Sequence, residues 1–169
     1  MTEPADALTA ASPGPHVVEV RLVPIDHRDA AELVEAQWAE LAERYGGGDP
    51  SQLDPLDFLE PRGAFLVVYL DSLPVSCGGF MPMTGEPGVV EIKRMYTVPN
   101  ARRSGFSRTV LGGLESEAAA LDYREMALVT GPRQPEAIAL YQSAGYRRRP
   151  NFGIWAEIPQ AICMAKSLR

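Results

Sequence analysis

The stretch from Pro99 to Leu111, PNARRSGFSRTVL, constrains the fold of this sequence more than any other segment. It follows a β-branched run, VVEIKRMYTV, and it leads into apolar positions at helical spacing, namely Val110, Leu111, Leu114, Ala118 and Leu121. A second β-type run, EMALVTG, comes next. The order strand, helix, strand predicts a βαβ crossover, with the helix beginning near Gly105.

This turn is basic although the chain as a whole is acidic. The formal net charge is −6, yet Arg102, Arg103 and Arg108 lie close together around Gly105. The first N–H groups of a helix have no partner within it, and the aligned peptide dipoles add partial positive charge there. The amides from Arg103 to Arg108 are therefore expected to converge on a phosphate or pyrophosphate. A solvated turn of surface arginines is the alternative interpretation.

The other segments complete a mixed α/β pattern. An alternating run from His16 to Pro24 predicts a first strand, and a helix follows with Asp26 or Asp29 as its cap. The runs AFLVVYLD and LPVSCGGFMPM predict a hairpin, which the turn TGEPG connects to VVEIKRMYTV. A helix over roughly 135–144 and a strand in AICMAKSL follow. We expect residues 1–15 to form a flexible tail and residues 16–169 to form one domain.

Composition and spacing exclude several classes of function. The acidic balance argues against a nucleic-acid partner, and no apolar run approaches the roughly 20 residues that cross a bilayer. His16 and His27 have no metal-ligand spacing, so we expect no metal site. Cys77 and Cys163 lie far apart in apolar surroundings, which favours packing roles in a reducing cytoplasm.

Three motifs, in order, resemble the GNAT superfamily of N-acetyltransferases. The family signature R/Q-x-x-G-x-G/A reads RRSGFS here, from Arg102 to Ser107, with serine in the last position. The preceding EIKRMYTVPNAR is similar to the family's fourth strand. The segment QPEAIALYQSAGY is similar to N-x-x-A-x-x-L-Y-x-x-x-G-F/Y, with Gln134 in place of asparagine. The resemblance extends over roughly residues 17–168.

The resemblance implies the GNAT fold, an α/β fold of the α+β type. Its mixed, mostly antiparallel twisted sheet has six to seven strands, flanked by about four helices, with a βαβ cofactor-binding unit. It also implies acetyl-CoA as donor, with a bulge that opens the sheet beside the pantetheine arm, and a backbone N–H at Tyr96 or nearby as the oxyanion donor. The residues that it assigns to the cofactor are Met95, Tyr96, Thr97, Arg102, Arg103, Ser104, Gly105, Phe106, Ser107, Arg108 and Gln134.

Two residues are candidates for proton transfer in an attack by an amine on the thioester. Glu91, six residues before Thr97, stands where some family members carry a catalytic glutamate, and a strand carboxylate paired with Lys93 is the alternative. Tyr141, the tyrosine of the LY pair, is the candidate acid for the leaving thiolate, and a packing role is the alternative. The acceptor is expected to be an amine of a small molecule or a protein.

Three readings of the whole chain stay open. They are an acetyl-CoA-dependent N-acetyltransferase, a non-catalytic CoA-binding regulatory module, and a transferase of another acyl group. A homodimer is possible, and the sequence offers no motif that identifies the acceptor.

Overall fold

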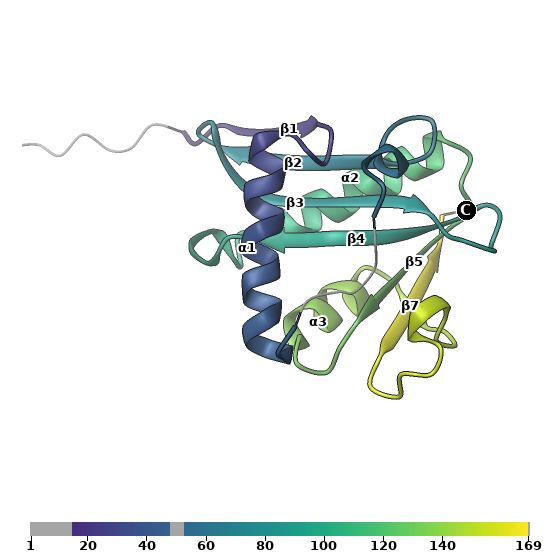
Figure 1. The fold of residues 1–169 in the computed structure, drawn as a ribbon. Coiled ribbons are helices and arrows are strands. Elements are labelled where there is room, and N and C mark those ends of the chain that lie inside the picture. Colours follow the sequence, from purple (N-terminus) through teal and green to yellow (C-terminus); the bar gives the residue numbers. More distant parts are fainter. Residues whose placement is uncertain (1–14, 48–52, 169) are drawn as a thin grey trace, which may run out of the picture.

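Figure 1 shows the fold as a computed structural model, which describes residues 15–47 and 53–168. Within these residues seven strands form one sheet in the order β1-β2-β3-β4-β5-β7-β6. The strands are β1 (Val18–Leu22), β2 (Ala64–Leu70), β3 (Leu73–Pro82), β4 (Val89–Thr97), β5 (Glu125–Thr130), β6 (Arg147–Arg148) and β7 (Ile162–Ser167). Only β4 and β5 pair in parallel; the other described pairs are antiparallel. The predicted mixed, mostly antiparallel sheet is confirmed.

The structure has fewer helices than expected. Its described residues contain three α-helices instead of about four: α1 (Arg28–Tyr45), α2 (Phe106–Ala120) and α3 (Pro135–Ser143). The remaining helical segments are single 3₁₀ turns, η1 (Pro55–Phe58), η2 (Pro99–Ala101) and η3 (Gly153–Trp155). Proline opens η1 and η2, and neither extends into an α-helix. Residues 1–14 of the predicted tail, residues 1–15, lie outside the described residues, as do residues 48–52.

The helices cover both faces of the sheet, with α1 in front in Figure 1 and α2 behind. The two faces of β2 show the division. Leu66 and Val68 pack in the cluster that contains Leu111 of α2, whereas Val67 packs in the cluster that contains Leu33 of α1. Because both of its faces are covered, β2 is a nearly continuous apolar run rather than an alternating one.

Local backbone features fix the ends of two elements. Asp71 and Ser72 both have positive φ, 49° and 68°, as a two-residue type I′ turn of a hairpin requires. The cap of α1 differs from the prediction, because the side chain of His27, rather than Asp26 or Asp29, accepts a hydrogen bond from the Asp29 N–H. Asp29 instead accepts a hydrogen bond from the buried Tyr69 hydroxyl at 2.8 Å.

Candidate active site

The fourth strand carries a β-bulge. The register with β3 shifts from Cys77 opposite Tyr96 to Gly79 opposite Lys93, so β4 contains one residue more than β3 between these pairs. Arg94, inside the bulge, has a φ of 60°, in the left-handed region that few non-glycine residues adopt. A bulge bends its strand and increases the local twist. The strand that resembles the family's fourth strand therefore has the bulge that the resemblance implies.

Beyond the bulge, β4 and β5 separate. They pair over only three residues of β4, Val89–Glu91, opposite 125–127 of β5. From there β4 continues to Thr97 with β3 as its partner, and Figure 1 shows β4 and β5 diverging towards α3. Two strands that part in this way leave backbone groups along one edge without a strand partner.

The backbone direction along β4 identifies those groups. The Tyr96 carbonyl accepts a hydrogen bond from Ser76 Oγ at 2.8 Å, and the Val98 N–H donates to the Val75 carbonyl at 2.9 Å, so both face β3. Successive residues of a strand direct their N–H and C=O groups to opposite edges. The groups of Met95 and Thr97 therefore face the gap.

The turn after β4 leaves the first amides of α2 accessible. Gly105 is the residue before the helix and adopts a φ of 86°, and no side chain of the described residues caps this end. Arg103, Ser104 and Gly105 are exposed, whereas Phe106 is buried in the core and anchors the helix. The amides are thus held in place but are not covered.

The three arginines of the turn point in different directions. Arg102 donates from Nε to the Thr97 carbonyl at 3.0 Å and pairs with Glu40 of α1 at 2.5 Å, so its guanidinium is directed towards α1. Arg108 donates to Ser143 Oγ of α3 at 2.8 Å. Arg103 is exposed and has no charged partner in the described part of the chain.

The gap and the turn open onto one cavity of about 1160 Å³. Its wall comes from β4, the start of α2, the end of α1, the β5–α3 loop and residues 155–161. Most of the predicted site residues line it, namely Glu91, Met95, Tyr96, Thr97, Arg102, Arg103, Phe106, Ser107, Gln134 and Tyr141. Ser104, Gly105 and Arg108 lie in the turn but outside this lining.

Glu91 lies at the base of the gap, in the last residue pair of β4 with β5. Its side chain is 14% exposed and lies 2.7 Å from Lys93 Nζ, which is itself 8% exposed. Residues two apart on a strand share a face, which explains this contact. The structure thus contains the ion pair of the alternative interpretation, and it also places Glu91 at the cavity wall.

Tyr141 of α3 is buried and reaches the cavity from the opposite wall. Its ring packs edge-on against Tyr146, with ring centres 5.6 Å apart. Burial raises the pKa of the Tyr141 hydroxyl above its ordinary value, so the hydroxyl holds its proton at neutral pH.

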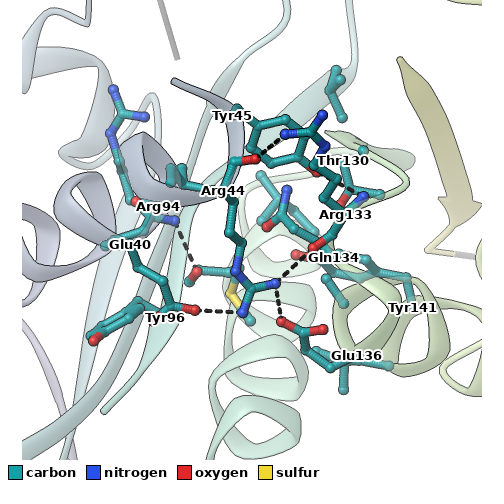
Figure 2. Close-up of a pocket in the computed structure, with 18 of the residues that line it drawn as sticks. Glu40, Arg44, Tyr45, Arg94, Tyr96, Thr130, Arg133, Gln134, Glu136 and Tyr141 are labelled. Atoms are coloured by element: carbon teal, nitrogen blue, oxygen red, sulfur yellow. Dashed lines mark hydrogen bonds and ion pairs between the residues drawn. The ribbon is translucent and has the colours of Figure 1, made fainter. Parts of the chain in front are cut away.

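A network of charged residues crosses the cavity from α1 to α3, as Figure 2 shows. Arg44 pairs with Glu40 at 2.6 Å and with Glu136 at 2.5 Å, and Glu40 also holds Arg102. Burial acts to raise the pKa of the Glu40 carboxyl, but Arg102 and Arg44 outweigh it and hold that pKa below its ordinary value. The end of α1 is therefore tied both to the turn and to α3.

The same helix end is joined to the β5–α3 loop by hydrogen bonds between side chains and backbone groups. Arg44 donates to the Arg133 carbonyl at 2.9 Å, and Arg133 donates to the Arg44 carbonyl at 2.5 Å. The Arg133 N–H also donates to the Tyr45 hydroxyl at 3.1 Å. The sequence patterns described above do not predict this network. The available signal was the polar stripe Gln37, Glu40 and Arg44, at helical spacing on α1.

Comparison with known proteins gives the family. The profile of the Acetyltransferase (GNAT) family matches residues 30–146, which include the bulged strand, the turn and α3. This chain belongs to the GNAT acetyltransferase family. An IAA acetyltransferase from Azospirillum brasilense is 33% identical over 155 residues, covering 91% of this GNAT chain and 99% of the relative.

Solved structures agree with the family. A structure from Klebsiella pneumoniae, provisionally assigned as an acyl-CoA N-acyltransferase, has a TM-score of 0.75 and 27% identity, covering 90% of this GNAT chain and 98% of its own. PaiA N-acetyltransferase from Thermoplasma acidophilum, solved in complex with coenzyme A, has a TM-score of 0.65 and 16% identity. The match covers 89% of this GNAT chain and 99% of the PaiA chain. At that identity the second likeness concerns the fold alone.

The described part of this GNAT chain offers neither a metal cluster nor a membrane-spanning helix. No cluster of three or more histidine, cysteine, aspartate or glutamate side chains there has the arrangement of a metal site. No helix among the same residues is both long and apolar enough to span a membrane. Cys77 and Cys163 are buried and free.

Proposed function

We propose that this GNAT chain is an acetyl-CoA-dependent N-acetyltransferase that acts on a primary amine by direct attack. The observation that carries the proposal is the continuity of one surface. The unpaired edge of β4 faces the gap with β5, and the same strand leads directly into the uncapped end of α2. The edge of β4 suits an extended amide-containing chain, and the uncapped end of α2 suits a pyrophosphate.

The turn provides the anion site. Amide N–H groups from Arg103 to Arg108 open α2, the positive φ of Gly105 turns them outward, and Arg103 adds an exposed positive charge. Arg102 has a different role in this proposal. Because Glu40 and the Thr97 carbonyl hold its guanidinium, Arg102 braces the turn against α1 rather than adding a charged contact to the phosphate.

The gap provides the site for the pantetheine arm. Met95 and Thr97 direct backbone groups into it, and an extended ligand pairs with such an edge as an added strand does. Gln37 donates to the Met95 carbonyl at 2.9 Å, and Arg102 donates to that of Thr97, so both carbonyls already have a partner. The N–H groups of these two residues, rather than that of Tyr96, are then the candidate oxyanion donors.

The proton steps use both walls of the cavity. An amine with a pKa of about 10.4 is almost fully protonated at pH 7, so a base must remove its proton before attack. Glu91 accepts that proton at the base of the gap, directly or through a water molecule. When the carbon–sulfur bond breaks, Tyr141 donates its proton to the sulfur, and the proton that the newly bonded nitrogen loses returns to the Tyr141 oxygen, directly or through a water molecule. Because burial raises the pKa of Tyr141, the hydroxyl is protonated when the thiolate leaves.

Ligand binding and acceptor turnover test the proposal in two steps. Acetyl-CoA and CoA should raise the melting temperature, and succinyl-CoA tests the reading that another acyl group is transferred. Amines are then screened for release of the CoA thiol, and IAA is tested beside them because of the A. brasilense relative's name. Binding without turnover of any acceptor favours the non-catalytic module, and no stabilisation by any CoA species contradicts the proposal.

A further inference from the structure

Lys93 places a primary amine on the wall of the cavity. The chain has 16 lysine and arginine residues, of which only Lys93 and Lys166 are lysines. The side chain of Lys93 is 8% exposed, and it belongs to the cavity lining. Its neighbour Arg94 directs a guanidinium over the Trp38 ring of α1, 5.1 Å from the ring centre. Because a guanidinium stays charged in proteins, Lys93 is the residue of this wall that can supply a nucleophilic nitrogen.

Lys93 lies at the level of β4 that the acetyl group of the donor reaches. In the proposed binding mode the pyrophosphate lies at the turn after Thr97, and the pantetheine arm runs back along the strand past Met95. The bulge and Lys93 come next in that direction. Glu91 follows as the last residue of β4 that pairs with β5. The thioester at the end of the arm therefore meets the part of the wall that carries Lys93.

The amine of Lys93 is already in contact with the candidate base. Lys93 Nζ lies 2.7 Å from a carboxylate oxygen of Glu91, whose side chain is 14% exposed. Both side chains lie on one face of β4, because the two residues are two positions apart. Transfer of a proton from Nζ to Glu91 therefore requires no bridging water.

We propose that Lys93 accepts the acetyl group of acetyl-CoA bound in its own cavity when no amine substrate is present, an inference that rests on the proposed function. Nζ gives one proton to Glu91 and forms a bond with the thioester carbon. As the carbon–sulfur bond breaks, the sulfur takes the Tyr141 proton. The second proton that the nitrogen loses returns to the Tyr141 oxygen, directly or through a water molecule. The products are an amide at Lys93 and the CoA thiol.

Lys166 is a matched comparison elsewhere in the sheet. Its Nζ lies 2.7 Å from a carboxylate oxygen of Glu115, the same distance as in the pair of Lys93 with Glu91. The side chain of Lys166 is 29% exposed, more than that of Lys93, and it lies outside the cavity lining. Chemical acetylation by acetyl-CoA in solution should favour the more exposed amine, whereas transfer within the cavity should favour Lys93.

Mass spectrometry of the full chain, incubated with acetyl-CoA in an amine-free buffer, tests the proposal. The intact mass should rise by one acetyl group per chain, and peptide mapping should place this group on Lys93. Because the cavity holds the two reacting groups together, Lys93 should react about tenfold or more faster than Lys166. Lys93→Arg keeps a positive charge beside Glu91 and should not gain this acetyl group, and its melting temperature checks that it folds.

Three further measurements separate transfer in the cavity from reaction in solution. Excess CoA competes for the cavity and should slow the modification of Lys93 but not that of Lys166. Diluting the protein should leave the rate constant for Lys93 unchanged, because the transfer takes place within one chain. Glu91→Gln should slow the modification of Lys93 about 10²-fold or more, whereas Glu115→Gln, which alters the matched pair, should leave it unchanged.

The proposal is overturned if Lys93 stays unmodified, or if it reacts no faster than Lys166. A rate constant that falls on dilution would also overturn it, because it would indicate transfer between chains. The melting temperature with acetyl-CoA distinguishes these failures from failure of the proposed function. If acetyl-CoA stabilises the chain but Lys93 stays unmodified, this inference alone fails. If acetyl-CoA neither stabilises the chain nor modifies Lys93, both fail.

Discussion

The two edges of β4 differ, and the difference separates what holds the fold from what forms the site. Towards β3 the strand is paired along nearly its whole length, from Val90 to Thr97, across the bulge. Towards β5 it is paired over only three residues. Because one edge anchors the strand, the other is free to face a ligand without loss of the sheet.

The side chains around the two edges differ in the same way. The β3 side is covered by apolar residues of α2, such as Leu111 and Leu114, which are almost completely buried. The β5 side is lined by charged groups, among them Glu40, Arg44 and Glu136, whose ion pairs cross the cavity. Substitutions beside the first edge should act on stability, and substitutions beside the second should act on binding and turnover.

Glu91→Gln should have the largest effect on the β5 side. If Glu91 is the base, kcat falls about 10²–10⁴-fold, and the loss is greatest near neutral pH. The pH profile of kcat, measured with a saturating amine, checks this.

Glu125→Gln is the matched control, because Glu125 is also a strand carboxylate in an ion pair, 3.2 Å from Arg149, but lies outside the cavity lining. An unchanged pH profile in Glu91→Gln would show that Glu91 is not the base, and its ion pair with Lys93 would then be its only role in this account.

Leu114→Ala should have the largest effect on the β3 side. Leu114 lies on the buried face of α2 and is fully buried, and such a truncation costs about 2–5 kcal/mol of unfolding free energy. Urea unfolding measures the loss, with the exposed Leu73→Ala as control. The affinity of the folded variant for acetyl-CoA should stay close to that of the wild type. A large loss of affinity would contradict the proposal that residues beside the β3 edge act on stability and not on binding.

Gly105→Ala should reduce acetyl-CoA affinity about tenfold or more, since a side chain at positive φ strains the turn and shifts its amides. Gly85→Ala is a close control. Both glycines have a φ above 80° and open space where a Cβ would lie, but Gly85 stands in the β3–β4 turn. The two variants should have similar stability, but calorimetric titration should show weaker acetyl-CoA binding by Gly105→Ala alone. Equal affinities would contradict the proposal that this turn binds the cofactor.

Tyr141→Phe should lower kcat, by roughly tenfold, while the Kd for acetyl-CoA changes little. Tyr146→Phe serves as the comparison, because Tyr146 packs against Tyr141 and is buried but does not line the cavity. If Tyr141 only packs, the two variants should lose stability alike and keep turnover.

Glu40→Gln should have the smallest effect, on the order of 1 kcal/mol of stability. The carboxyl has a folded-state pKa below its ordinary 4.5, so its ion pairs stabilise the fold above that pH and stop doing so as the pH falls through the lowered value. The difference in unfolding free energy between wild type and variant should therefore shrink below pH 4.5. Glu43→Gln, on the exposed side of the same helix, should show no such trend. A difference that is constant with pH would argue against the network.

Local patterns in the sequence predicted the sheet, the crossover and the turn, because strand alternation, helical spacing and Gly105 act over a few residues. They did not predict the network around Arg44. Its partner Glu136 is distant in sequence, and the polar stripe of α1 is indistinguishable from a solvated face until the fold places α3 opposite it. The direction of Arg102 was missed for the same reason, since it depends on Glu40.

A crystal structure of the protein with acetyl-CoA tests the central claim most directly. The account predicts the pyrophosphate within hydrogen-bonding distance of backbone N–H groups between Arg103 and Arg108, and the pantetheine arm along Met95 and Thr97 in the gap between β4 and β5. Density for the diphosphate at another site, or an arm that does not enter the gap, would contradict it.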